Sequence, residues 1–154
     1  MSCRLRASLP SRRQTPLRLA LITGAGVVAL AGCGGGDGVN QLAVIDPHAT
    51  QVDAISGRTI MKEILAIAGP TLEPGSAIAV KEWCINTAAV DPARKSILVN
   101  SEDGYLYRWD LTANQLTQRI QLTSGIGESY TPTAIGADGA VYAVNNAVLF
   151  SIGR

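Results

Sequence analysis

Short apolar segments separated by turn residues constrain the fold of this chain more than any other feature. From Gln41 onward, β-branched and apolar runs are interrupted every several residues by pairs such as Asp46-Pro47, Asp91-Pro92 and Asp138-Gly139. Proline presets the φ of a turn, and Asp and Gly tolerate the positive φ that tight turns need. We therefore predict an all-β fold, with strands at residues 42–45, 50–54, 77–80, 84–90, 97–100, 105–109, 116–122, 130–135, 140–144 and 148–152.

Residues 59–68 are the one stretch whose pattern fits both kinds of regular structure. Ile60, Ile64 and Ala68 fall at helical spacing, whereas Ile60, Met61 and Ile64 also suit a buried strand. We predict a strand here, with a helix as the alternative.

Two short motifs in the carboxy-terminal half look alike. Residues 103–107 (DGYLY) recur thirty-five residues later as 138–142 (DGAVY), which predicts a structural repeat. In each copy Asp-Gly would form a hairpin turn, with Leu106 or Val141 on one face of the following strand and the tyrosines on the other. A second related pair places Asp53 four residues before Gly57 and Asp110 four before Asn114, as two further hairpins would.

The amino-terminal segment has the character of an export signal. Five arginines and no acidic residue precede an apolar run at residues 19–31, which has the length of a secretory signal and is too short to span a bilayer. The run ends in Leu30-Ala31-Gly32-Cys33, which resembles the lipobox of bacterial lipoproteins. The resemblance implies cleavage before Cys33 and a lipid on its sulfur. We predict a helical signal peptide at 1–32, the lipidated cysteine and a glycine-rich tether at 33–40, and a β domain at 41–154.

Charge and cysteine content narrow the classes of function. The segment after Cys33 carries eight basic and twelve acidic side chains, a net charge of −4, and has no basic stripe of the kind that nucleic-acid binding requires. Cys84 would then be the one unmodified cysteine, so no structural disulfide is expected, and we interpret it as a small buried residue. The single histidine, His48, follows Asp46-Pro47 in what we predict to be a turn.

Other polar and aromatic residues give weaker indications of a site. Asn100, Glu102 and Asp103 supply oxygen atoms beside Gly104, but they lack the ligand spacing of a calcium loop, so we predict a solvated hairpin turn. The two tryptophans, Trp83 and Trp109, are expected in the core. We assign no catalytic, cofactor-binding or metal-binding residue, and Cys33 is the single predicted site, for attachment of lipid.

Residues 103–114 resemble the repeat of PQQ-type β-propellers, in which Asp-Gly, an apolar residue, Tyr and Asp precede Thr-x-Gly. Asn114 replaces the usual glycine, and the tryptophan that often follows is missing. More broadly, residues 44–153 resemble the carboxy-terminal part of secreted bacterial propeller proteins. The resemblance implies two to three antiparallel blades, an incomplete propeller, because a blade takes about 40 to 45 residues and a closed ring has at least four. Assembly of several copies into a ring, a compact β-sandwich and a shortened gene product all remain open.

Three functional hypotheses follow. The first is a non-catalytic binding or assembly module anchored at the periplasmic face of the outer membrane, similar in role to the propeller lipoprotein of the barrel-assembly machinery. Its partners would be the membrane, through the lipid on Cys33, and an envelope protein or a second copy of the chain. The second is a propeller fragment without independent activity. The third is a quinone-dependent oxidoreductase, for which the resemblance implies an adjacent-cysteine disulfide, calcium and an aspartate base in a complete ring; the sequence has no Cys-Cys pair.

Overall fold

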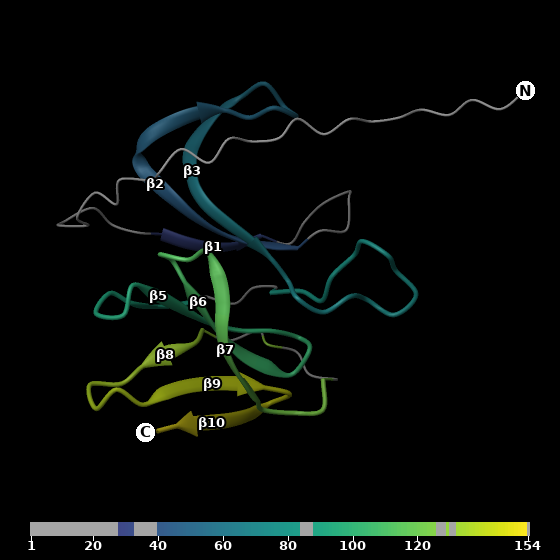
Figure 1. Cartoon of the computed structure of the whole chain (residues 1–154), viewed down its shortest axis with the longest axis vertical. Helices are drawn as coiled ribbons and strands as arrows, with labels where there is room; N and C mark the ends of the chain where they lie inside the picture. Colours follow the sequence, from purple (N-terminus) through teal and green to yellow (C-terminus); the bar gives the residue numbers. More distant parts are fainter. Residues whose placement is uncertain (1–27, 33–39, 84–87, 126–128, 130–131, 154) are drawn as a thin grey trace, which may run out of the picture.

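A computed structural model of the chain describes residues 28–32, 40–83, 88–125, 129 and 132–153. Within these ranges every element of regular secondary structure is a β-strand, and the strands form three antiparallel sheets (Figure 1). The predicted all-β class is therefore confirmed. The described residues contain no helix with the length and apolar character needed to cross a membrane.

The first sheet consists of β1 (Val28–Gly32), β2 (Gln41–Val52) and β3 (Thr59–Ala68), in that order. β1 comes from the end of the predicted signal peptide; the rest of that segment, and Cys33, lie outside the described residues. β3 confirms the strand predicted at 59–68. The break predicted at Asp46-Pro47 does not end a strand: β2 continues through it with a register shift between Asp46 and Thr50, so the strands predicted at 42–45 and 50–54 are one strand. An irregularity of this kind can hold a proline, which cannot donate to the ladder.

The middle sheet consists of β4 (Ala89–Asp91), β5 (Ser96–Asn100), β6 (Tyr105–Asp110) and β7 (Gln115–Gln121). The third sheet consists of β8 (Ala134–Ile135), β9 (Val141–Asn145) and β10 (Val148–Ile152). In each sheet every strand pairs with its neighbour in sequence. This arrangement needs only short turns, which the Asp, Gly, Asn and Pro residues supply.

Three further predicted strands differ from those observed by more than one residue at an end. Residues 77–80 form no strand, and only an isolated bridge joins Leu72 to Val80. Ser76 provides the physical reason, since its hydroxyl oxygen accepts hydrogen bonds from the backbone N–H groups of Ile78 and Ala79, which a strand would use for its ladder. The strands predicted at 84–90 and 130–135 are observed as Ala89–Asp91 and Ala134–Ile135 only, and residues 84–87 and 130–131 lie outside the described ranges.

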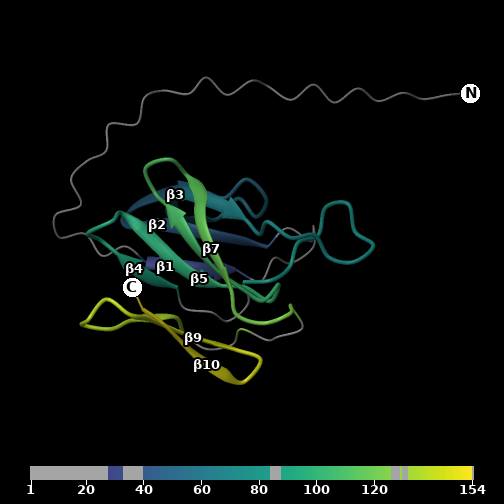
Figure 2. The same ribbon diagram turned by 60° about the horizontal axis from the view of Figure 1, so that its bottom comes forward.

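The three sheets lie face to face, with the middle sheet between the other two (Figures 1 and 2). One apolar core joins the first sheet to the middle sheet and includes Leu42, Val99 and Trp109. A second core joins the middle sheet to the third sheet and includes Leu98, Leu106, Val141 and Ala143. The stack therefore has three layers. Trp83 and Trp109 are fully buried, as predicted.

The two Asp-Gly motifs both form turns, but at different places in the stack. Gly104 and Gly139 have φ values of 87° and 82°, which confirms the predicted turn conformation. Asp103-Gly104 joins the second and third strands of the middle sheet, however, whereas Asp138-Gly139 joins the first and second strands of the third sheet. The thirty-five-residue repeat is therefore wrong.

The positions that correspond between these two sheets are Asn100 and Asn145. Each is the last residue of the second strand of its sheet, and the two are 45 residues apart. A sequence comparison aligned on Asp-Gly misses this correspondence, because the same turn chemistry serves any hairpin.

The other predicted pair of hairpins is confirmed. An Asp53 carboxylate oxygen accepts a hydrogen bond from the Ser56 N–H at 2.8 Å, and an Asp110 oxygen accepts one from the Thr112 N–H at 2.7 Å. Gly57 and Asn114 follow with positive φ values of 67° and 52°. In both turns the aspartate satisfies backbone donors at the start, and the fourth residue after it reverses the chain.

Candidate functional site

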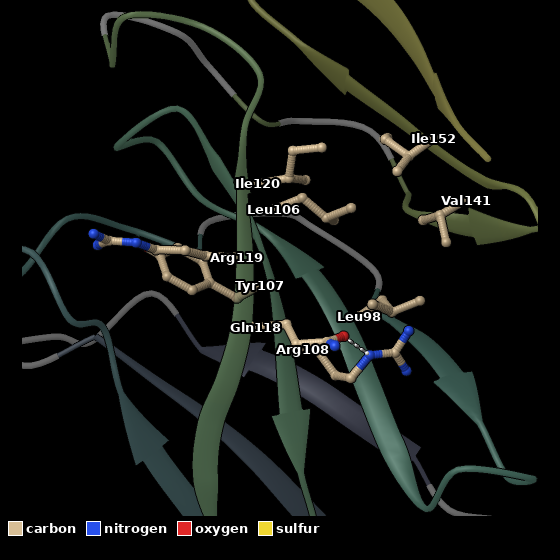
Figure 3. A pocket seen from close by; sticks show the side chains of 9 residues that line it. All are labelled: Leu98, Leu106, Tyr107, Arg108, Gln118, Arg119, Ile120, Val141 and Ile152. Carbon is tan, nitrogen blue, oxygen red and sulfur yellow. Dashed lines mark hydrogen bonds between the residues drawn. The ribbon is translucent and has the colours of Figure 1, made fainter. Parts of the chain in front are cut away.

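An apolar groove lies between the middle and third sheets, where their outer strands separate (Figure 3). It has a volume of about 390 Å³ and is lined by Leu98, Leu106 and Ile120 on one side and by Val141 and Ile152 on the other. We call this set of residues the groove. An apolar cavity of about 150 Å³ already admits benzene. The groove is thus large enough to receive several apolar side chains.

The groove follows from strand alternation and from unequal sheet width. Leu106 of β6 is paired with Ile120 of β7, so both side chains point to the same face of the middle sheet. Because the described part of the third sheet ends at β10, none of its strands lies opposite β7. Ile120 is consequently 44% exposed, although it belongs to an otherwise covered face.

A fixed cation closes one end of the groove. The Arg108 guanidinium donates to the Asp91 carboxylate at 3.2 Å and to the Ser96 hydroxyl at 2.6 Å, while its Nε donates to the Gln118 side chain at 2.8 Å. Burial alone would raise the pKa of Asp91, but hydrogen bonds from Arg94 and Arg108 hold that pKa below its usual value. The guanidinium charge is thus balanced and held in place beside an apolar surface.

A pair of buried asparagines ties the same two sheets together. The Asn145 amide donates to the Asn100 side-chain oxygen and to the Ser101 carbonyl, both at 3.0 Å, and the Asn100 amide donates to the Val144 carbonyl at 2.6 Å. The Thr123 hydroxyl donates to the Asn145 oxygen at 2.7 Å. Asn100 and Asn145 are both fully buried. These bonds fix how closely the two sheets approach, and thereby the width of the groove.

The turn at Asp103 is held by a network of hydrogen bonds and is not solvated. The Tyr107 and Thr71 hydroxyls donate to one Asp103 carboxylate oxygen at 2.6 and 2.7 Å, and the Tyr105 N–H donates to the other at 3.0 Å. Burial, and then the hydrogen bond to Asp103, raises the pKa of Tyr107 well above its usual value, so its phenol stays protonated and donates. The Asp103 oxygens are thus already engaged with donors from residues 71, 105 and 107.

The predicted solvation of this hairpin is therefore wrong. Asp103 is only 8% exposed and Asn100 is fully buried. The reason is tertiary: the Gly104 carbonyl accepts hydrogen bonds from the N–H groups of Leu122 and Thr123, which brings another segment over the turn. Local sequence gives no sign of that covering segment.

The remaining candidate residues are placed as follows. Cys33 and Cys84 lie outside the described residues, so the predictions made for them are untested. His48 is exposed on β2, and its backbone N–H donates to the Asp46 carboxylate at 2.8 Å. Within the ranges that the structure describes, no group of three or more His, Cys, Asp and Glu side chains could hold a metal ion.

Sequence reasoning did not find the groove. Its one local signal is that Ile120 in β7 and Leu122 just after it are two residues apart, which places both apolar side chains on the face toward the third sheet. That pattern alone does not show that the neighbouring sheet is narrower.

No protein-family model matches the chain, and no curated protein matches it either. Its function is therefore inferred from the groove and from the amino-terminal sequence.

Proposed function

We propose that this chain is a lipid-anchored, non-catalytic binding or assembly module of the bacterial envelope, built from blades of an incomplete β-propeller. Cys33 would carry the lipid, residues 33–40 would form the tether, and residues 41–154 would form the binding domain at the periplasmic face of the outer membrane. The net negative charge of the segment after Cys33 disfavours nucleic acid as a ligand.

The arrangement of the sheets supports the interpretation as blades. The middle sheet has four antiparallel strands in chain order, and both of its faces are covered by other sheets. Four-stranded sheets that follow one another around an axis are the units of a propeller. The 45-residue spacing between Asn100 and Asn145 agrees with the length of one blade.

The groove is the observation that carries the binding role. Binding sites are typically concave and apolar, with a small number of placed polar groups. The groove has this composition, with Leu98, Leu106 and Ile120 on its middle-sheet side and Arg108 at one end. Two of its polar side chains, Arg108 and Gln118, hold each other in place by a hydrogen bond, which supports recognition of a shape more than chemical conversion of a substrate.

Cleavage before Cys33 would also change the first sheet. β1 pairs with β2 along residues 28–32, so removal of the signal peptide would remove β1 and leave one edge of β2 unpaired. The mature domain would then offer a strand edge at its first sheet as well as the groove near its third.

The anchor is tested by replacing Cys33 with Ser in the full chain. Each buried CH₂ of an acyl chain contributes about 0.8 kcal/mol, so several chains give a firm anchor. We expect Cys33→Ser to abolish incorporation of a labelled fatty acid and to lose the protein from outer-membrane fractions on a density gradient. Cys84→Ser is the matched control and should retain both. Undiminished lipid labelling of Cys33→Ser would contradict the proposal.

A further inference from the structure

β1 forms one edge of the first sheet and, among the described strands, is the one that precedes the predicted cleavage point (Figure 1). It runs antiparallel to β2, from Val28 opposite Ile45 to Gly32 opposite Gln41. The other side of β2 pairs with β3. At residues 41–45, β2 is therefore an inner strand while β1 is in place, and an edge strand without it.

The same five residues include the segment that a signal peptidase would have to bind. Leu30, Ala31 and Gly32 are the last three residues of β1, and they lie opposite residues 41–43 of β2. A peptidase that cleaves before Cys33 must take the backbone of these residues into its own site. It therefore competes with β2 for them, and pairing in the sheet protects the bond that is to be cut.

The covalent connection is what keeps this pair together. Residues 33–40 join β1 to β2, and a link of this length holds two segments at an effective concentration of about millimolar. A pairing over five residues has little stability of its own, since even an isolated hairpin is marginal in water. Cleavage before Cys33 cuts the link, so β1 loses its effective concentration and dissociates.

We propose that β1 is an autoinhibitory strand, which occupies the edge of β2 at residues 41–45 in the uncleaved chain and leaves it on cleavage before Cys33. The opened edge then accepts a strand of an envelope partner by strand addition. β1 itself shows what fits this edge, because its sequence, VALAG, is extended and uncharged. Exposed edges pair readily with other chains, so an edge that opens only after processing is protected before it. This inference rests on the proposed function and adds its regulation.

The pairing is tested with two cysteines in the uncleaved chain. The native cysteines are removed by Cys3→Ser, Cys33→Ser and Cys84→Ser. Val28 lies opposite Ile45 and Ala29 opposite Val44, and such neighbouring pairs alternate between closer and wider spacing. On mild oxidation we expect an intramolecular disulfide in Val28→Cys with Ile45→Cys or in Ala29→Cys with Val44→Cys. Val28→Cys with Gln41→Cys is the matched control, because Gln41 lies four residues, or about 13 Å, further along β2. Cross-linking of both opposed pairs that is no stronger than the control would overturn the proposal.

The release is tested by amide hydrogen exchange in the same detergent. The uncleaved Cys33→Ser chain is compared with the processed wild-type chain. We expect the amides of residues 41–45 to exchange about tenfold faster or more in the processed chain, because they lose one neighbouring strand. β5 is the internal control, since it keeps both of its neighbours, and should exchange equally in the two chains.

The mass of the wild-type chain separates the two proposals. A chain that keeps its leader would contradict the proposed cleavage, and with it the release, even where the disulfide confirms the pairing. A cleaved and lipidated chain whose residues 41–45 stay as protected as in Cys33→Ser would overturn the autoinhibition and leave the anchor intact.

Discussion

β5 and β10 have the same length and similar apolar content, yet their environments are opposite. All five residues of β5, Ser96–Asn100, are buried, whereas β10 has three exposed and two half-buried residues. Ile97 and Leu98 are close in apolar character to Val148 and Leu149, and the polar Ser96 and Asn100 of β5 are buried as well. The difference is the layer: β5 lies in a sheet that is covered on both faces, and β10 forms the edge of a sheet covered on one. Burial in this molecule is thus decided by position in the stack and not by residue hydrophobicity.

The first sheet extends the same comparison. Its inward residues, Leu42 and Val44, are buried against the middle sheet, while Ile60 and Ile64 on β3 are each 42% exposed. Both end sheets therefore have one covered face, and the middle sheet is the layer that contributes to both cores. We expect the stability of the domain to be concentrated there.

The largest effect should come from a tryptophan of the middle sheet. Trp109 is fully buried between the first and middle sheets, and its indole N–H donates to the Asn114 side chain at 3.0 Å. Trp109→Ala should lower the free energy of unfolding by about 3 to 5 kcal/mol, as expected for a large buried aromatic. Leu149→Ala, on the third sheet, should lower it by no more than about 0.5 kcal/mol. Denaturant titration of both variants measures the two free energies of unfolding. Equal losses would mean that the middle and third sheets contribute equally to stability.

The two Asp-Gly turns offer a sharper form of the contrast. At both glycines the positive φ disfavours any residue with a Cβ, by about 1 to 2 kcal/mol. A Cβ on Gly104 would in addition meet the Thr123 carbonyl and the Gly125 N–H nitrogen at 2.7 Å, whereas one on Gly139 would meet nothing within 4 Å. From the sequence alone we predict equal effects at the two turns; the structure predicts unequal ones.

Gly104→Ala should therefore cost about 2 to 4 kcal/mol, because the backbone must also shift to relieve the overlap. Gly139→Ala should cost the conformational penalty alone. The two melting curves, recorded side by side, decide the matter. Equal destabilisation would show that the backbone at 123–125 shifts at little cost and does not hold the turn in place.

The sequence predicted those features whose causes are local. The strands at 59–68 and 148–152 were predicted with the bounds observed, since turn residues flank both segments and mark their ends. The strand expected at 77–80 failed because the Ser76 hydroxyl competes for its backbone donors, an interaction that propensity does not reveal.

The order of layers, the groove and the buried asparagines could not be predicted, because they depend on which sheet covers which. Asn100 and Asn145 look like ordinary polar residues at strand ends, and polar side chains there are usually solvated. The lipid on Cys33 remains a prediction from the resemblance. The local sequence does determine which face of each strand is apolar. The side chains that line the groove come from such apolar faces.

The last prediction concerns a coupling energy, between the two asparagines that link the middle sheet to the third sheet. Asn145 contacts both Asn100 and the Ser101 carbonyl, so Asn145→Ala leaves buried polar groups without their partners and should cost about 1 to 3 kcal/mol. If the asparagines act as one unit, Asn100→Ala should add less when Asn145 is already replaced, with a coupling energy of at least about 0.5 kcal/mol in a double-mutant cycle. Asn114 lies at the opposite end of the middle sheet and bonds to Trp109, so a cycle of Asn145 with Asn114 should be additive. Additivity in both cycles would mean that apolar contact alone holds the third sheet, and the groove would then be free to change its width when a partner binds.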